Sequence, residues 1–243
     1  MIPLRDSNPS GSPPVVTMVL IALNLIIWFY QVSLGRAVDQ FVIEYGLIPL
    51  RFAMSYRLDG GILDNAAVPL FSSIFMHGGW LHVIGNMWFL LIFGDNVEDR
   101  LGHVRFLLFY LLCGIGASLA HILFNPASRI PTIGASGAIS GVLGAYLVSF
   151  PYARIHTLFI IFFFIRFIEI PAFLFLVVWF LFQFLSGASQ IGVYQDTGGV
   201  AYWAHMGGFV IGVILIWIFP RSSRFRDRSS DDEDYPRRTH RRW

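Results

Sequence analysis

Two side chains in apolar parts of the chain, Ser136 and His205, could together carry out nucleophilic chemistry. A hydroxyl beside an imidazole is the smallest arrangement that supports acyl transfer, because the imidazole takes the hydroxyl proton and later gives it to the leaving amine. The tetrahedral intermediate needs hydrogen-bond donors for its oxyanion, and the side chains of His82 and Asn86 could supply them with the Ser136 backbone N–H. The apolar runs around Ser136 and His205 contain no Asp or Glu, so we predict a dyad rather than a triad.

Each of these residues also has a plainer structural interpretation. Serine is common in membrane helices, so Ser136 taken alone is more simply a small packing residue. His82 and Asn86 lie four residues apart, on one helix face, and could form a structural hydrogen bond between helices. The catalytic hypothesis therefore requires that the separate segments meet.

The composition describes a membrane protein. Hydrophobic residues make up 56% of the chain and charged residues 13%, whereas a soluble domain has about a quarter charged residues. The single cysteine, Cys113, excludes an internal disulfide and a cysteine-based metal site. We expect an integral multi-pass protein embedded in a lipid bilayer, with no cofactor, no metal ion and no nucleic-acid partner.

The apolar runs predict an all-α membrane protein with six transmembrane helices, over residues 15–32, 80–96, 104–124, 134–150, 171–185 and 201–219. Residues 1–14 form a cytoplasmic leader, and residues 34–73 form a structured surface loop between the first two helices. Residues 155–167 are expected to be an interfacial or re-entrant connection, and residues 190–199 a polar loop that could cap the site. Residues 220–243 form an Arg-rich tail, which we expect to be disordered and cytoplasmic.

The predicted topology brings the polar residues to one depth. Most arginines fall on the inner side if both termini are cytoplasmic, as membrane topology favours. The second, fourth and sixth helices then run in the same direction, with His82, Ser136 and His205 all toward the outer face. The fourth and sixth helices each carry glycines at a four-residue spacing that permits close helix contact: Gly137 and Gly141, and Gly208 and Gly212.

Taken together, these segments resemble the rhomboid intramembrane serine proteases over about residues 15–219. The resemblance is carried by H-G-G-W-L-H-V-I-G-N at 77–86, E-D-R-L-G at 98–102, G-A-S-G at 134–137 and A-H-M-G-G-F-V-I-G at 204–212. It implies Ser136 as nucleophile, His205 as general base and acid, and His82 and Asn86 at the oxyanion. It implies a structural role for His77, as a brace of the surface loop. From the residues themselves we expect Glu98 to accept backbone hydrogen bonds in the turn after the second helix. We also expect structural support from the glycines at the close-packed positions: Gly134, Gly137, Gly141, Gly208 and Gly212.

Two positions depart from the family pattern. Val68 and Pro69 stand where the family often has Trp-Arg, and Ser140 stands where it often has an aromatic residue that stacks on the catalytic histidine. The sequence therefore leaves open what orients the ring of His205.

The resulting hypothesis is an endopeptidase that cleaves transmembrane segments of other membrane proteins, in a prokaryotic plasma membrane. An inactive rhomboid-like factor that binds or escorts membrane proteins is the alternative. A metal transporter or metalloprotease using His77, His82 and His205 is disfavoured, because their spacing lacks the H-E-x-x-H pattern and no carboxylate lies nearby. The sequence does not predict the oligomeric state.

Overall fold

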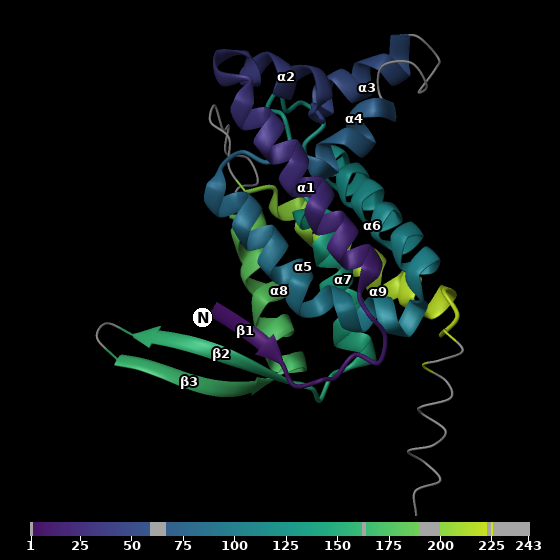
Figure 1. Cartoon of the computed structure of the whole chain (residues 1–243). Coiled ribbons are helices and arrows are strands. Elements are labelled where there is room, and N and C mark those ends of the chain that lie inside the picture. Colours follow the sequence, from purple (N-terminus) through teal and green to yellow (C-terminus); the bar gives the residue numbers. More distant parts are fainter. Residues whose placement is uncertain (1, 59–66, 162–163, 190–199, 223–224, 226–243) are drawn as a thin grey trace, which may run out of the picture.

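In this computed structural model, the described residues are 2–58, 67–161, 164–189, 200–222 and 225. They form a helical bundle with a small antiparallel sheet at one end (Figure 1). The helices are α1 (Val15–Ser33), α2 (Val38–Tyr45), α3 (Pro49–Leu58), α4 (Ala67–Ser72), α5 (Trp80–Leu101), α6 (His103–Phe124), α7 (Ser136–Ser149), α8 (Ala172–Ala188) and α9 (Tyr202–Ile218), with 3-10 turns η1 (Gly35–Ala37) and η2 (Ser73–Phe75).

Each apolar run that we expected to span the membrane is helical. By length and composition, α1 and α6 are long enough to cross a bilayer, and α5 could form a third span together with α4 and η2, from which it is bent by 86°. The apolar helices α7, α8 and α9 are shorter, at 14, 17 and 17 residues. Because a 14-residue helix rises only about 21 Å, against about 30 Å of hydrocarbon, the count of six spans stays a proposal.

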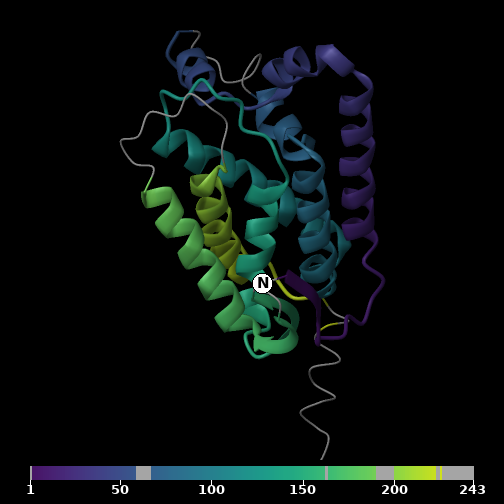
Figure 2. The same cartoon turned by 90° about the vertical axis from the view of Figure 1, so that its left-hand side faces the viewer.

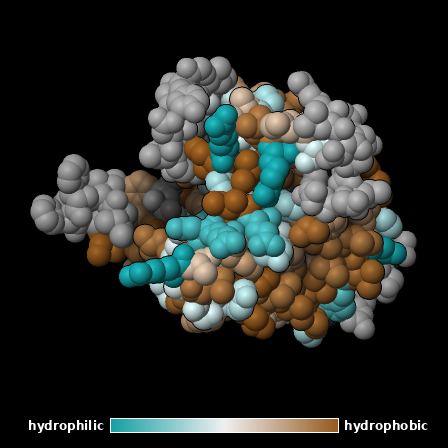
Figure 3. Space-filling model, turned by 90° about the horizontal axis from the view of Figure 1, so that it is seen from above, coloured by the Kyte–Doolittle hydropathy of each residue, from teal (hydrophilic) through white to brown (hydrophobic). Residues whose placement is uncertain are grey.

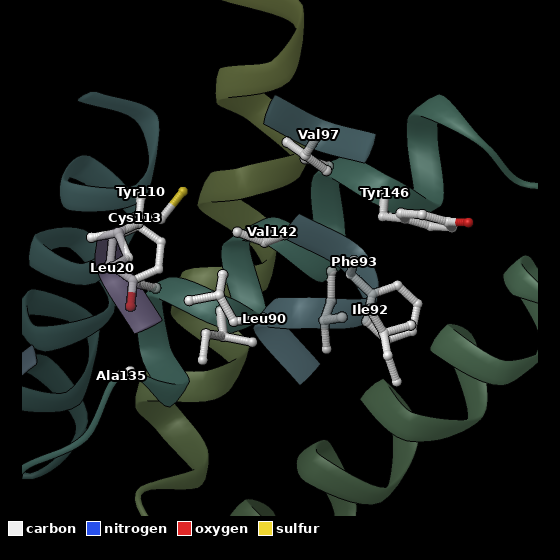
Figure 4. Packing of buried hydrophobic residues seen from close by; sticks show 14 of the residues in the cluster. Leu20, Leu90, Ile92, Phe93, Val97, Tyr110, Cys113, Ala135, Val142 and Tyr146 are labelled. Atoms are coloured by element: carbon white, nitrogen blue, oxygen red, sulfur yellow. The ribbon is translucent and has the colours of Figure 1, made fainter. Parts of the chain in front are cut away.

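Helix α7 lies at the centre of the bundle. In Figure 2 it stands between α5 on one side and α9 and α8 on the other, and its residues 137–146 are all buried. Side chains from α1, α5 and α6 converge on it in the core, among them Leu20, Leu90, Phe93 and Tyr110 (Figure 4). Helix α7 is therefore held by packing on several sides.

The outer surface of the bundle is strongly apolar. Large hydrophobic side chains are exposed along α1, α5, α6 and α8, as expected of helices that face lipid. Seen from the end that carries α2 and α3, polar side chains occur near the centre and broad hydrophobic areas lie toward the periphery (Figure 3).

The segment between α1 and α5 is fastened to the chain just before α7. Leu47 and Thr132 exchange two backbone hydrogen bonds, with N···O distances of 3.2 and 2.7 Å. The backbone N–H of Gly134 donates to the carbonyl of Ser73 at 2.8 Å. These bonds fix the backbone that leads into Ser136.

A three-stranded antiparallel sheet, which the sequence analysis did not predict, changes the fold class. Strands β1 (Ile2–Asp6), β2 (Arg154–Ile161) and β3 (Phe164–Pro171) pair in the order β1-β2-β3. The fold is therefore mostly helical rather than all-α: residues 155–161 and 164–167, expected in an interfacial or re-entrant connection, lie in paired strands, and residues 2–6 of the leader form a third strand. A continuous apolar run cannot be assigned to strand or helix by periodicity alone, and this one is rich in β-branched and aromatic residues.

Burial on one face of β2 explains the sheet's position. Ile155 and Thr157 are fully buried, whereas Arg154 is exposed and lies 3.6 Å from Glu169 of β3. The sheet is also joined to the bundle through β1: the Trp88 indole N–H donates to the Pro3 carbonyl at 2.6 Å.

Glu98 accepts backbone hydrogen bonds as predicted, but its carboxylate accepts them from the start of α1 rather than within the turn after α5, where its backbone carbonyl accepts the Gly102 N–H at 2.7 Å. It accepts the backbone N–H groups of Val16 and Thr17 at 2.8 and 2.7 Å, and it pairs with His103 at 2.6 Å. A carboxylate at this position satisfies free N–H groups and complements the positive end of the α1 dipole. The bend that follows uses Gly102, whose φ is +80°.

Candidate active site

The glycine positions of α7 and α9 form a seam of close backbone contact. A Cβ added at Gly208 would lie 2.0 Å from the carbonyl oxygen of Gly137, and one at Gly212 would lie 2.0 Å from that of Gly141. Only glycine permits this approach, because any side chain would overlap the facing backbone. The contact predicted between these two helices is present.

The seam brings Ser136 and His205 together. Ser136 is the first residue of α7, and His205 lies in the first turn of α9. The Ser136 Oγ lies 2.7 Å from His205 Nε2, within hydrogen-bonding distance. His205 is only 9% exposed, whereas Ser136 is partly exposed.

The other ring nitrogen of His205 contacts a residue that sequence reasoning missed. His205 Nδ1 lies 2.8 Å from Oε1 of Gln183, on α8. The available signal was a single amide in the middle of a 17-residue apolar helix. The indole of Trp179, one turn earlier on α8, also lies beside the imidazole, with 6.2 Å between the ring centroids.

His82 and the backbone before Ser136 face each other. The Gly78 backbone N–H donates to His82 Nδ1 at 3.3 Å, which leaves Nε2 to carry the proton. A Cβ added at Gly134 would lie 2.7 Å from His82 Nε2 and 3.5 Å from Ser136 Oγ, and Gly134 has a φ of +135°. Position 134 therefore needs glycine for both its backbone conformation and the space that His82 occupies.

Asn86 lies one turn after His82 on α5 and is 8% exposed. Its Nδ2 is buried without a hydrogen-bond partner among the described residues. A buried amide donor of this kind is costly unless something accepts from it. Asn86 Nδ2, one of the predicted oxyanion donors, is therefore free of hydrogen bonds among the described residues.

Comparison with known proteins decides the family. Residues 64–222 match the family model described as the rhomboid domain, which is more than half of the chain. The chain belongs to the rhomboid family. Similar proteins include RHOMBOID-like protein 1 of Arabidopsis thaliana (32% identical over 66% of this chain and 37% of that protein) and mitochondrial Rhomboid protein 1 of Saccharomyces cerevisiae (28%, over 88% and 66%). The Rhomboid protease GluP of Bacillus subtilis is 33% identical over 55% of this chain and 24% of its own length.

Membership of the rhomboid family, together with the apolar helices, makes this an integral membrane protein. The prokaryotic plasma membrane expected from the sequence is not supported, because the relatives include proteins named for mitochondria and for chloroplasts. The chain spans about two thirds or less of the first two relatives named above.

His77 lies beside His82 of the candidate site. Its backbone N–H and carbonyl are both held by the side chain of Gln31 on α1, at 2.9 and 3.1 Å. Its ring meets that of His82 edge to face, with 5.1 Å between centroids. These contacts fit a role in bracing the start of α5.

Ser140 does not replace the aromatic residue seen in many rhomboids. Its hydroxyl donates to the carbonyl of Ser136 at 2.6 Å, within α7. A small cavity of about 20 Å³ borders Ser136, and its polar lining residues include Ser73, Ser118 and Thr132. The lining is more apolar than polar, and a space of this size is large enough for a single water molecule.

No cluster of three or more His, Cys, Asp or Glu side chains that could hold a metal ion occurs in the described part of the chain. The polar loop at 190–199, expected to cap the site, lies outside the described residues, as does nearly all of the Arg-rich tail.

Proposed function

We propose that this chain is an intramembrane serine endopeptidase that cleaves transmembrane segments of other membrane proteins. The observation that carries the proposal is the 2.7 Å approach of Ser136 Oγ to His205 Nε2. Membership of a family that includes a protein named as a rhomboid protease supports it.

In the proposed reaction, His205 Nε2 takes the Ser136 proton as Oγ attacks the scissile carbonyl carbon. The tetrahedral intermediate collapses, the C–N bond breaks, and the imidazolium gives its proton to the departing amine. A water molecule, deprotonated by the same nitrogen, then hydrolyses the acyl-enzyme and regenerates the Ser136 hydroxyl.

We assign three hydrogen-bond donors to the oxyanion of the tetrahedral intermediate. The Ser136 backbone N–H lies at the start of α7, where helical N–H groups have no partner within the helix and the dipole favours negative charge. The Nε2–H of His82 and the unpartnered amide of Asn86 approach from α5. Donors held in place before the reaction stabilise developing charge without reorganising.

The depth of the site follows from the length of α7. Ser136 precedes the far end of this helix by 13 residues, a rise of about 20 Å. If that end lies at the inner surface of a bilayer core about 30 Å thick, Ser136 lies about 10 Å below the outer surface. We therefore propose six spans, with both termini on the inner side and the serine reached from the outer side.

Substrates are expected to be transmembrane helices that unwind easily near the outer face. A peptide bond inside a helix is hydrogen-bonded and shielded, so Ser136 can reach only a locally extended chain. Small or helix-breaking residues near the cleavage point should therefore favour cleavage.

The decisive experiment compares the purified protein with Ser136→Ala in liposomes, using a labelled transmembrane substrate. We expect cleavage by the first and none by the second, and a fluorophosphonate probe should label Ser136 alone. Equal cleavage by both proteins would exclude the dyad. Substrate binding without cleavage by the unaltered protein would instead favour the inactive escort factor.

A further inference from the structure

We propose that Gln183 is the positioning residue of this site, holding the imidazole of His205 in the tautomer and orientation that Ser136 requires. The inference rests on the proposed function and extends the dyad to a Ser136–His205–Gln183 chain. It also answers the question that Ser140 leaves open, namely what fixes the His205 ring.

The identity of the contacting atoms determines the tautomer. The oxygen of an amide can only accept a hydrogen bond, so the 2.8 Å contact between Gln183 Oε1 and His205 Nδ1 places the proton on Nδ1. Nε2 then presents a lone pair to the Ser136 hydroxyl, 2.7 Å away. In the opposite tautomer the Nδ1 lone pair would face the Gln183 oxygen, and Nε2–H would donate to Ser136 Oγ instead of accepting its proton.

Residues on one face of α8 support the orientation of the His205 imidazole. Trp179, Gln183 and Gly187 recur every four residues and therefore share one side of the helix. The Trp179 ring lies beside His205, and a Cβ added at Gly187 would lie only 3.2 Å from the Cβ of Tyr202 on α9. Glycine at 187 thus allows α8 to approach the start of α9, which brings the Gln183 side chain within reach of His205.

A neutral amide suits a buried imidazole inside a membrane. A carboxylate at this position would have to be kept ionised in a low-dielectric environment, which is costly. An amide dipole keeps the ring oriented in both protonation states without adding a charge. The other titratable groups near His205 in the described residues are His82 of α5 and His121 of α6.

The test uses Gln183→Met, which keeps the length of the side chain but removes the acceptor, and Gln183→Glu, which keeps an acceptor and adds a negative charge. The matched control is Phe182→Leu, at the neighbouring position on the exposed side of α8. Because the lost hydrogen bond is made to a group that becomes charged during the reaction, we expect Gln183→Met to lower kcat by about 10- to 100-fold with little change in KM. We expect Gln183→Glu to retain activity and to move the acid limb of the kcat/KM profile to higher pH.

A second measurement separates this proposal from the protease proposal. In the inactive Ser136→Ala protein, the ¹⁵N spectrum of His205 should show a proton on Nδ1, and adding Gln183→Met should redistribute it toward Nε2. Unchanged tautomer populations, or full kcat with an unchanged pH profile in Gln183→Met, would overturn the positioning role. Because the spectrum requires no turnover, it tests Gln183 even if the unaltered protein cleaves nothing.

Discussion

Gly208 is the position at which the site depends most directly on the absence of a side chain. In Gly208→Ala the new Cβ would lie 2.0 Å from the Gly137 carbonyl oxygen, whereas ordinary contacts begin at 3.4 Å. Lengthening this 2.0 Å separation to an ordinary 3.4 Å contact requires α7 and α9 to move apart locally by about 1.4 Å. Because Gly137 follows Ser136 and Gly208 lies three residues after His205, the distance between Ser136 Oγ and His205 Nε2 would grow from 2.7 to as much as about 4.1 Å.

A gap of that size exceeds hydrogen-bonding distance. We expect kcat/KM for a transmembrane substrate in liposomes to fall by about 100-fold or more, since misplacement by about 1 Å can have that effect. The free energy of unfolding should fall by about 1–3 kcal/mol from overpacking. The matched control is Gly85→Ala on α5, where a Cβ would meet nothing within 4 Å. If Gly208→Ala matches that control in both measurements, the account of the seam is wrong.

Three further changes test other parts of the structure. Gly134→Ala places a Cβ 2.7 Å from His82 Nε2 at a φ of +135°. Fluorophosphonate labelling of Ser136 should therefore slow by about 100-fold. An unchanged labelling rate would contradict the geometry. Glu98→Gln replaces the buried carboxyl group that accepts the N–H groups at the start of α1. Chemical denaturation should show that the free energy of unfolding falls by about 1–3 kcal/mol. An unchanged free energy of unfolding would mean that the cap is unimportant. Burial raises the pKa of the Asp6 carboxyl from 3.8 to about 6, so the folded chain holds this proton more tightly than the unfolded chain. The Asp6 contribution to stability is therefore full below about pH 4 and is lost as pH rises through about 6. Asp6→Asn should raise the melting temperature at about pH 8 and have little effect at about pH 4. A pH-independent difference in melting temperature would refute this reasoning.

Much of the candidate site could be predicted because its residue types are unusual in apolar segments. Ser136, His205, His82 and Asn86 are polar residues in apolar helices, and the paired glycine spacings indicate which helices touch. The sequence did not predict Gln183, because a single amide in an apolar helix can face lipid, a neighbouring helix or a reacting group equally well. Its direction is set by the packing of α8 on α9, which no local pattern reports.

The same distinction separates the helices from the sheet. The positions of the apolar helices follow from runs of hydrophobic residues and from their polar, glycine or proline boundaries, which are local properties of the chain. The sheet requires Ile2–Asp6 to pair with a segment about 150 residues later, and Glu98 finds its partners at the start of α1, 81 and 82 residues before it. By itself the sequence predicted the candidate reacting residues and the apolar helices. Only the tertiary structure decided which distant groups hydrogen-bond to one another, because those bonds depend on how the packed helices are arranged in space.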